Sequence, residues 1–286
     1  MNKSRRLNST NVEVFPIGLG AMPLSLAGRP DEIEALDVIN TFIDGGGDFI
    51  DTANVYCADE TDVGHNEKLI AKALSRSDNQ IIVATKGGLR RPTDNWTVDA
   101  SPAWLRHSCE KSLVDLNSDS IFLYQLHAPD PEVPLMDSIG ELAKLKDEGK
   151  IQHIGLSNVT VEHIELALSI THIISVQNRC NLFERTSFKN GVVDFCENNN
   201  ITFIAHSPVG GHYQHKQHSE NILLKRLSEK FDTSSYQIMI AWLLHKSSSI
   251  FPIPGASKAS SIKGSIQALN VELSKEDMQL LEAIIN

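Results

Sequence analysis

The sequence predicts an α/β protein that folds as a (β/α)8 TIM barrel. Eight short apolar runs alternate with segments whose apolar residues recur at helical spacing, and 286 residues are enough for eight such units. Because strands that alternate with helices favour a parallel sheet, eight repeats favour a closed barrel over an open sheet. The expected strands are residues 15–19, 48–52, 81–86, 121–127, 153–157, 174–177, 201–205 and 250–254.

Amphipathic segments between these runs are expected to form the outer helices. Asp31 follows a proline and precedes regularly spaced apolar residues, which is typical of a helix N-terminal cap. The helices are expected at residues 31–44, 65–75, 102–116, 135–148, 161–169, 188–198, 235–245 and 259–269.

Two additions to the repeat are expected. Ser274 is a candidate cap for an extra C-terminal helix over residues 275–285, and the polar residues 1–13 are expected to form a flap or hairpin over the barrel floor. Because no linker-like or low-complexity stretch interrupts the chain, residues 1–286 are expected to form a single barrel domain.

The composition excludes several classes of function. A formal net charge of -10 argues against a nucleic-acid or anionic membrane surface, and no apolar stretch approaches the ~20 residues of a membrane span. The basic start lacks the apolar core of a secretory signal. We therefore expect a cytoplasmic protein that acts on a small molecule; the sequence does not indicate its oligomeric state. Scattered cysteines are expected to be free thiols: Cys57, Cys109, Cys180 and Cys196.

Four polar residues lie where three expected strands end. Asp51, Lys86 and His127 end consecutive apolar runs, and Tyr56 begins the loop after the first of them. Because neighbouring parallel strands lie only ~5 Å apart, these side chains should meet at the carboxyl rim of the barrel. Each residue alone has a structural explanation. Asp51 could be a helix cap and Lys86 a solvated charge. His127 could be a core imidazole and Tyr56 a loop anchor. Together they indicate a proton-transfer site.

An ordered set of motifs resembles the aldo-keto reductases, and it extends over nearly the whole chain. Family membership implies a (β/α)8 barrel and hydride transfer from a nicotinamide cofactor to a carbonyl group. No single motif is decisive, whereas the ordered set is highly specific. The motifs are Phe49-Ile50-Asp51-Thr52-Ala53-Asn54-Val55-Tyr56, Gly64-His65-Asn66-Glu67, Thr85-Lys86, Leu126-His127, Gly155-Leu156-Ser157-Asn158, Val176-Gln177-Asn178, Ser207-Pro208 and Ile253-Pro254-Gly255-Ala256.

The resemblance implies a role for each of the four polar residues. Tyr56 would protonate the developing alkoxide, and Lys86 beside it would lower the phenol pKa from ~10. Asp51 would keep Lys86 charged and oriented. His127 would donate a hydrogen bond to the substrate carbonyl oxygen.

The resemblance also implies a cofactor site, with NADP(H) expected and NAD(H) as the alternative. Ser157, Asn158 and Gln177 match residues that bind the nicotinamide carboxamide. His206 stands where relatives have an aromatic ring under the nicotinamide, so its protonation should weaken NADP⁺ binding at acidic pH. Further residues matched to this site are Ser207, Pro208, Gly210, Ser257, Lys258 and Lys263.

The expected adenosine site departs from the family pattern. Ser261 replaces an arginine, and Gly264-Ser265 replaces a Glu-Asn pair. Lys258 and Lys263 remain available for the 2′-phosphate, although lysine lacks the bidentate fork of arginine. A plain solvated helix face explains both lysines almost as well.

Residues 210–218 form a histidine-rich segment that is expected to be a loop near the cofactor pyrophosphate. His212, His215 and His218 could share one face and bind a transition metal only if this segment were helical. A cationic, pH-sensitive clamp on the cofactor pyrophosphate is favoured over metal binding. A plain solvated loop is preferred to both, and no metal is expected. On the substrate side, Met22 and Trp96 are expected to line the pocket.

Two other functions remain open at this stage. A Schiff-base aldolase would use Lys86 as a nucleophile, but Asp51 beside it would keep the amine charged. A cofactor-binding regulator with vestigial turnover would fit the altered adenosine site, although four intact polar residues argue against it. Reduction of an aldehyde or ketone by NADPH is the preferred hypothesis.

Overall fold

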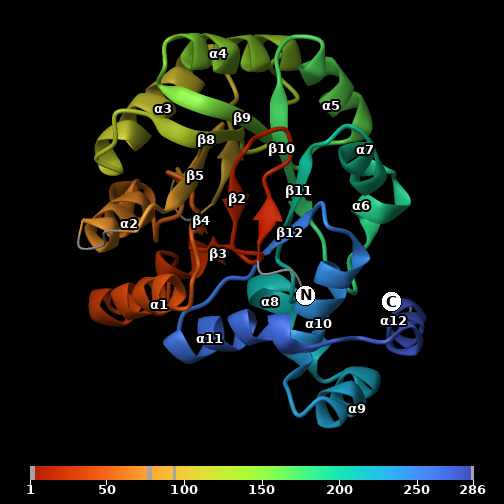
Figure 1. Cartoon of the computed structure of the whole chain (residues 1–286). Helices are drawn as coiled ribbons and strands as arrows, with labels where there is room; N and C mark the ends of the chain where they lie inside the picture. Colours follow the sequence, from red (N-terminus) through yellow and green to blue (C-terminus); the bar gives the residue numbers. More distant parts are fainter. Residues whose placement is uncertain (1–3, 76–78, 93–94, 285–286) are drawn as a thin grey trace.

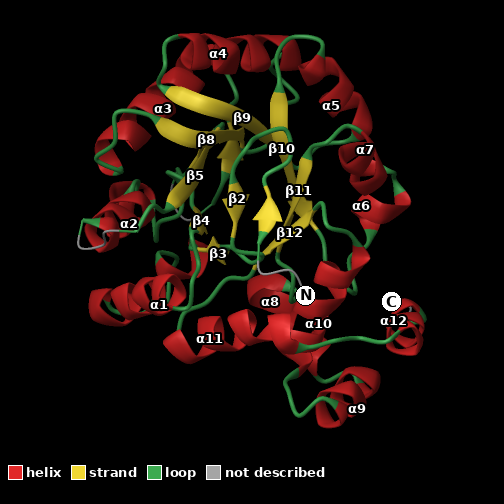
Figure 2. Cartoon of the chain, in the orientation of Figure 1, coloured by secondary structure: helices red, strands yellow, loops and turns green. Residues whose placement is uncertain are grey.

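The computed structural model describes residues 4–75, 79–92 and 95–284, and it is a (β/α)8 barrel. Eight parallel strands form one sheet, and a parallel bridge between Gly20 and Gly255 joins its first and last strands. Helices surround the strands (Figure 2). In order round the barrel, the strands are β3 (Leu19–Gly20), β4 (Phe49–Asp51), β5 (Ile82–Gly87), β8 (Ile121–Leu126), β9 (Ile151–Ser157), β10 (Ile173–Arg179), β11 (Thr202–His206) and β12 (Ile250–Ile253).

The first strand is shorter and later than expected. Residues 15–19 were expected to pair, whereas β3 contains only Leu19 and Gly20. Pro16 has no N–H to donate to a ladder, so regular pairing cannot extend back through it. The Gly18 N–H donates to Pro252 O at 3.0 Å and the Gly20 N–H to Pro254 O at 3.0 Å, which closes the barrel beside β12.

Most of the expected outer helices are present. Asp31 caps α1 as predicted, because its side chain accepts a hydrogen bond from Glu34 N at 2.9 Å. The helices that match expectation are α1 (Glu32–Asp44), α2 (His65–Leu74), α3 (Pro102–Asp115), α4 (Leu135–Asp147), α5 (Val161–Leu168), α10 (Ser235–Lys246) and α11 (Ala259–Gln267).

Two predictions about helices were wrong. The single helix expected over 188–198 is divided into α6 (Thr186–Lys189) and α7 (Val192–Asn198). Gly191 lies between them with φ +80°, a left-handed conformation that interrupts a helix. The segment after β11, expected to be a loop, forms α8 (Gly211–Ser219), and α9 (Ile222–Lys230) follows it.

Both additions to the repeat are present within the described residues. A hairpin of β1 (Arg5–Arg6) and β2 (Glu13–Val14) lies at the amino-terminal mouth of the barrel, where Figure 1 shows β2 in the middle of the ring of helices. The Arg5 guanidinium fixes it there by donating to the carbonyl groups of Leu244 and Ser247. Ser274 caps the extra helix α12 (Lys275–Glu282), because its side chain accepts a hydrogen bond from Asp277 N.

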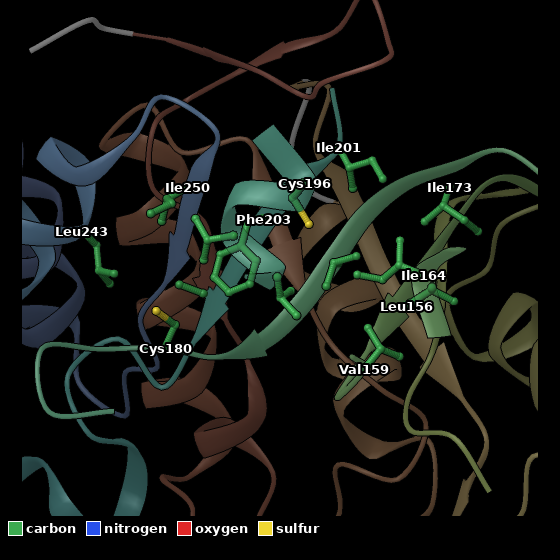
Figure 3. Close-up of a cluster of buried hydrophobic side chains, with 14 of the residues drawn as sticks. Leu156, Val159, Ile164, Ile173, Cys180, Cys196, Ile201, Phe203, Leu243 and Ile250 are labelled. Carbon is green, nitrogen blue, oxygen red and sulfur yellow. The ribbon is translucent and has the colours of Figure 1, made fainter. Parts of the chain in front are cut away.

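The largest apolar core lies between the strands and the outer helices. Figure 3 shows one part of it, where Leu156, Ile173 and Phe203 come from neighbouring strands and Ile164 and Leu243 from helices. All four cysteines are free and buried. None of the described helices is both long and apolar enough to span a bilayer.

Candidate active site

Strand register brings the predicted polar residues together at the carboxyl rim. Asp51 is the last residue of β4, and it pairs with Ala84 of β5, two residues before Lys86. Lys86 pairs in turn with Gln125 of β8, and His127 follows that strand with its N–H bound to Gly87 O at 2.8 Å. Because side chains alternate along a strand, Gln125 and His127 point to the same side as Lys86, into the barrel mouth.

The Lys86 ammonium group is fully buried and has three hydrogen-bond acceptors. Its Nζ donates to Asp51 Oδ2 at 2.6 Å, to Thr52 O at 2.8 Å and to Tyr56 Oη at 3.1 Å. An ammonium has three protons, so this set satisfies it completely. Burial lowers the pKa of Lys86, but the Asp51 carboxylate and the interactions with Asp51 and Tyr56 outweigh burial and raise it. Lys86 is therefore charged.

Tyr56 is almost fully buried, and its hydroxyl group faces Lys86. A turn closed by Tyr56 N donating to Ala53 O at 3.1 Å returns its ring to the rim. Burial raises the pKa of Tyr56 above its ordinary value, and Lys86 only partly offsets this. Lys86 lowers this pKa, as predicted, but desolvation of the phenolate raises it by more, so the net pKa lies above its ordinary value.

His127 is a neutral imidazole beside the Tyr56 ring. The two ring centroids are 5.8 Å apart at an interplanar angle of 80°. Burial, followed by the positive charge of Lys86, holds the pKa of His127 well below its usual range. Its buried Nδ1 has no hydrogen-bond partner among the described residues. A neutral imidazole has one N–H, so His127 can donate a single hydrogen bond.

Two glutamine side chains hold the second oxygen of Asp51. Gln177 Nε2 donates to Asp51 Oδ1 at 2.7 Å, and Gln125 Nε2 donates to the same atom at 3.2 Å. A buried carboxylate needs such donors in addition to its cation. Gln125 was not predicted from the sequence. The available signal was a polar residue inside an apolar run, two positions before His127 and therefore on the same face.

The residues expected at the nicotinamide lie together at the ends of β9 and β10. Ser157 pairs with Gln177 across these strands. Asn158 follows in a left-handed conformation, φ 58°, and its Nδ2 donates to His127 O at 2.9 Å and to Ser157 Oγ at 3.1 Å. This set therefore lies directly beside the predicted proton-transfer residues.

His206 ends β11, where it pairs with Arg179 and lies next to Ser207 Oγ, 3.1 Å from its Nδ1. Burial lowers the pKa of His206 to about 3, with smaller contributions from Lys86 and Arg179. His206 is therefore expected to stay neutral at mildly acidic pH, which does not support the expected loss of NADP⁺ affinity in that range.

The other residues expected at the cofactor lie after β11 and β12. Ser207 has φ 53°, Pro208 is buried, and Gly210, with φ 101°, precedes α8. Ser257 and Lys258 are exposed at the start of α11, and the exposed Lys263 lies within this helix. The substituted positions Ser261, Gly264 and Ser265 belong to α11 as well.

The histidine-rich segment is a helix, but its described side chains have separate partners. His215 Nδ1 lies 2.8 Å from Gly211 O, whereas the His218 ring stacks on Phe183 with centroids 4.1 Å apart. The side chain of His212 lies outside the described set. Among the described residues, no group of three or more His, Cys, Asp or Glu side chains could hold a metal ion.

Both residues expected on the substrate side lie near Tyr56. Met22 packs against an apolar cluster that contains Val55, Tyr56 and Leu89. The Trp96 ring is 42% exposed, and its centroid is 6.4 Å from that of Tyr56. An apolar wall therefore borders the Tyr56 ring.

A (β/α)8 barrel with ionisable side chains at its carboxyl rim is typical of enzymes. Comparisons with known proteins give the family. A model of the aldo/keto reductase family matches residues 16–286. The chain is 35% identical over 265 residues to an uncharacterised oxidoreductase from Schizosaccharomyces pombe, an alignment that covers 91% of this chain and 83% of that protein. The protein belongs to the aldo/keto reductase family.

Solved structures share its fold. A thermostable aldo-keto reductase crystallised with the inhibitor epalrestat superposes with a TM-score of 0.82 and 28% identity over 98% of both chains. An aldo-keto reductase from Klebsiella pneumoniae, solved in complex with NADPH, superposes with a TM-score of 0.84 and 22% identity, covering 99% of this chain and 95% of that one. These superpositions agree with the closed (β/α)8 barrel described above.

Proposed function

We propose that this protein reduces an aldehyde or ketone to an alcohol with NADPH. One observation carries the proposal: the buried Lys86 ammonium contacts both the Asp51 carboxylate and the Tyr56 hydroxyl, at 2.6 Å and 3.1 Å. This arrangement holds a protonated phenol next to a fixed positive charge at the open rim of the barrel. Such a phenol can give up its proton to an oxygen that becomes negative.

Tyr56 supplies the proton in the proposed reaction. The cofactor, when bound, supplies hydride to the carbonyl carbon, and the carbonyl oxygen takes the Tyr56 proton to become a hydroxyl group. The raised pKa of Tyr56 keeps the phenol protonated before this step. Lys86 stabilises the phenolate left behind, and the neutral His127 donates a hydrogen bond to the same substrate oxygen.

The chemistry of the rim amides fits a nicotinamide carboxamide. Asn158 and Gln177 use their amide nitrogens within the protein, toward His127 O and Asp51 Oδ1 respectively. Their amide oxygens remain as acceptors, and a carboxamide NH₂ group has two protons to donate. Ser157 beside them has a hydroxyl group that can donate to the carboxamide oxygen.

The preference for NADP(H) over NAD(H) rests on the start of α11. Ser257 and Lys258 are exposed there, and Lys263 is exposed within the helix. Two cations close to a helix N-terminus favour a phosphate group. The K. pneumoniae structure of the same fold contains NADPH. His206, neutral and partly buried, is assigned to the nicotinamide ring, and Ser207, Pro208 and Gly210 to the adjoining segment.

A turnover assay tests the proposal and separates it from its rivals. With NADPH and 4-nitrobenzaldehyde, we expect equal amounts of cofactor consumed and alcohol formed. Tight NADPH binding without turnover over a broad panel of aldehydes and ketones would instead indicate a regulator. A Schiff-base aldolase needs a neutral lysine, whereas Lys86 is held charged. Trapping of substrate on Lys86 by borohydride would contradict our proposal.

A further inference from the structure

A second cation, Arg91, lies beside the mouth of the proposed active site. It follows β6 (Leu89–Arg90), on the loop that leads to β7 (Thr97–Val98). Its Nη2 donates to Ala58 O at 3.1 Å, two residues after Tyr56. Its guanidinium carbon lies 5.1 Å from the centroid of the Trp96 ring. Arg91 and Trp96 therefore form one unit next to the phenol.

Arg91 differs from the arginine that precedes it. Arg90 Nε donates to Asp99 Oδ2 at 2.6 Å, and the Arg90 guanidinium lies 3.8 Å from the Trp104 ring centroid, so its charge is compensated. No described carboxylate lies within ion-pair distance of Arg91, and its buried Nε has no hydrogen-bond partner among the described residues. Because a guanidinium has five N–H donors, Arg91 keeps donor capacity for a ligand.

Nearby acidic residues are already engaged. Asp62 binds the Arg29 guanidinium and accepts from Ala58 N at 3.2 Å. Asp59 accepts hydrogen bonds from the backbone and side chain of Thr61 at 2.9 Å and 2.7 Å. These carboxylates lie on the same loop as Ala58, but neither forms an ion pair with Arg91 within the described part of the chain.

Arg91 lies on the side of the barrel opposite His206. In the order of the eight strands, β5, which precedes the Arg91 loop, is four places from β11, which ends at His206. In a closed ring of eight, four places is the opposite side. A carbonyl compound held at Tyr56 and His127 can thus extend toward Arg91 without meeting the cofactor phosphates.

We propose that Arg91 and Trp96 form a subsite for a carboxylate on the carbonyl substrate. The apolar wall of Met22, Val55 and Leu89 would contact the body of such a substrate, with its aldehyde or ketone at Tyr56 and its anionic end at Arg91. A guanidinium suits a carboxylate because it can donate two parallel hydrogen bonds. This inference rests on the proposed reduction, and it narrows the substrate class to oxo acids with an apolar body.

Kinetics on a matched pair of aldehydes test the subsite. For 4-carboxybenzaldehyde and its neutral methyl ester, methyl 4-formylbenzoate, we expect the wild type to show the higher kcat/KM with the acid. Arg91→Gln should lower kcat/KM for the acid by about 10- to 100-fold, mainly through KM, with the ester changed less than about 3-fold. Arg90→Gln, which removes the compensated neighbouring charge, is the control and should affect both substrates equally.

A binding measurement keeps the test independent of turnover. Calorimetric titration of benzoate into the protein saturated with NADP⁺ should show binding that Arg91→Gln abolishes and added salt weakens, while benzamide should bind the two proteins equally. Equal losses for acid and ester, or benzoate binding unchanged in Arg91→Gln, would overturn the subsite. If neither aldehyde turns over but benzoate binding depends on Arg91, the subsite stands and the proposed reduction fails.

Discussion

Gln177 donates its amide nitrogen to Asp51 Oδ1 at 2.7 Å, although these residues lie 126 positions apart in the chain. Gln177 lies in β10 and is predicted to bind the nicotinamide. Its contact with Asp51 therefore links the expected cofactor site to the carboxylate that holds Lys86. Asp51 thus has donors on both oxygens, with Lys86 on Oδ2 and two glutamines on Oδ1. In the proposed mechanism this network orients the ammonium that faces Tyr56.

Removing the Gln125 amide should weaken this network. In Gln125→Leu, Asp51 Oδ1 loses one of its two amide donors, so we expect the free energy of unfolding to fall by about 1–3 kcal/mol and kcat to decrease with it. Urea unfolding and steady-state kinetics measure both quantities. An unchanged unfolding midpoint together with wild-type kcat would show that Gln125 does not support Asp51.

Substitutions at the buried ion pair of Lys86 and Asp51 should affect stability and activity differently. Lys86→Met leaves the Asp51 carboxylate without its cation, and we expect a loss of about 3–5 kcal/mol of unfolding free energy. Adding Asp51→Asn removes the buried charge and should restore most of that stability, but carbonyl turnover should remain absent. Recovery of turnover in the double variant would refute the role proposed for Lys86.

Glu67 should make the fold less stable as the pH rises. Burial raises the pKa of Glu67 to about 7, although Thr85 Oγ1 donates to its Oε1 at 2.6 Å. The folded state therefore holds a proton that the unfolded chain releases at lower pH. The stabilisation from this proton is complete below the unfolded pKa and disappears as the pH rises through about 7.

Glu67→Gln should remove this pH dependence. The difference in unfolding free energy, variant minus wild type, should rise by about 3 kcal/mol from acidic to alkaline pH, because only the wild type loses this stabilisation. Denaturant titrations over this range measure the difference, with the exposed Glu229→Gln as the control. If the two unfolding curves remain parallel with pH, Glu67 titrates normally in the folded protein.

The neutral state of His206 predicts how cofactor binding depends on pH. Because its pKa is lowered to about 3, the slope of NADP⁺ affinity between about pH 5.5 and 8 should be the same in the wild type and in His206→Phe. Fluorescence titration of cofactor at several pH values measures the slope. A steeper loss of affinity at acidic pH in the wild type alone would mean that His206 titrates in that range.

The sequence alone allowed the barrel and the rim residues to be predicted, because both depend on periodicity. Asp51, Lys86 and His127 each end an apolar run, and parallel strands place such ends together. The division of a helix at Gly191 was not evident, since an isolated glycine within a helical pattern is often tolerated. The helix over 211–219 begins with Gly211, is preceded by Gly210 and has no apolar face, so its pattern resembled a loop.

Other features of the site depend on three-dimensional contacts that no local pattern encodes. The direction of the Tyr56 pKa follows from a competition between burial and Lys86, and burial is known only from the folded chain. The pairing of Gln177 with Asp51 similarly joins distant segments. Arg91 was not predicted because the sequence does not distinguish it from the adjacent Arg90. Only the structure shows that Asp99 pairs with Arg90 and not with Arg91.

The most direct test of the account is the Tyr56→Phe variant, measured for carbonyl turnover and for NADPH binding together. We expect kcat to fall by about 100-fold or more, since the general acid is lost, with cofactor affinity close to that of the wild type. Tyr124→Phe, which removes a buried hydroxyl 3.4 Å from Leu105 O, is the matched control and should retain activity. Wild-type turnover by Tyr56→Phe would contradict the proposal that this phenol protonates the substrate.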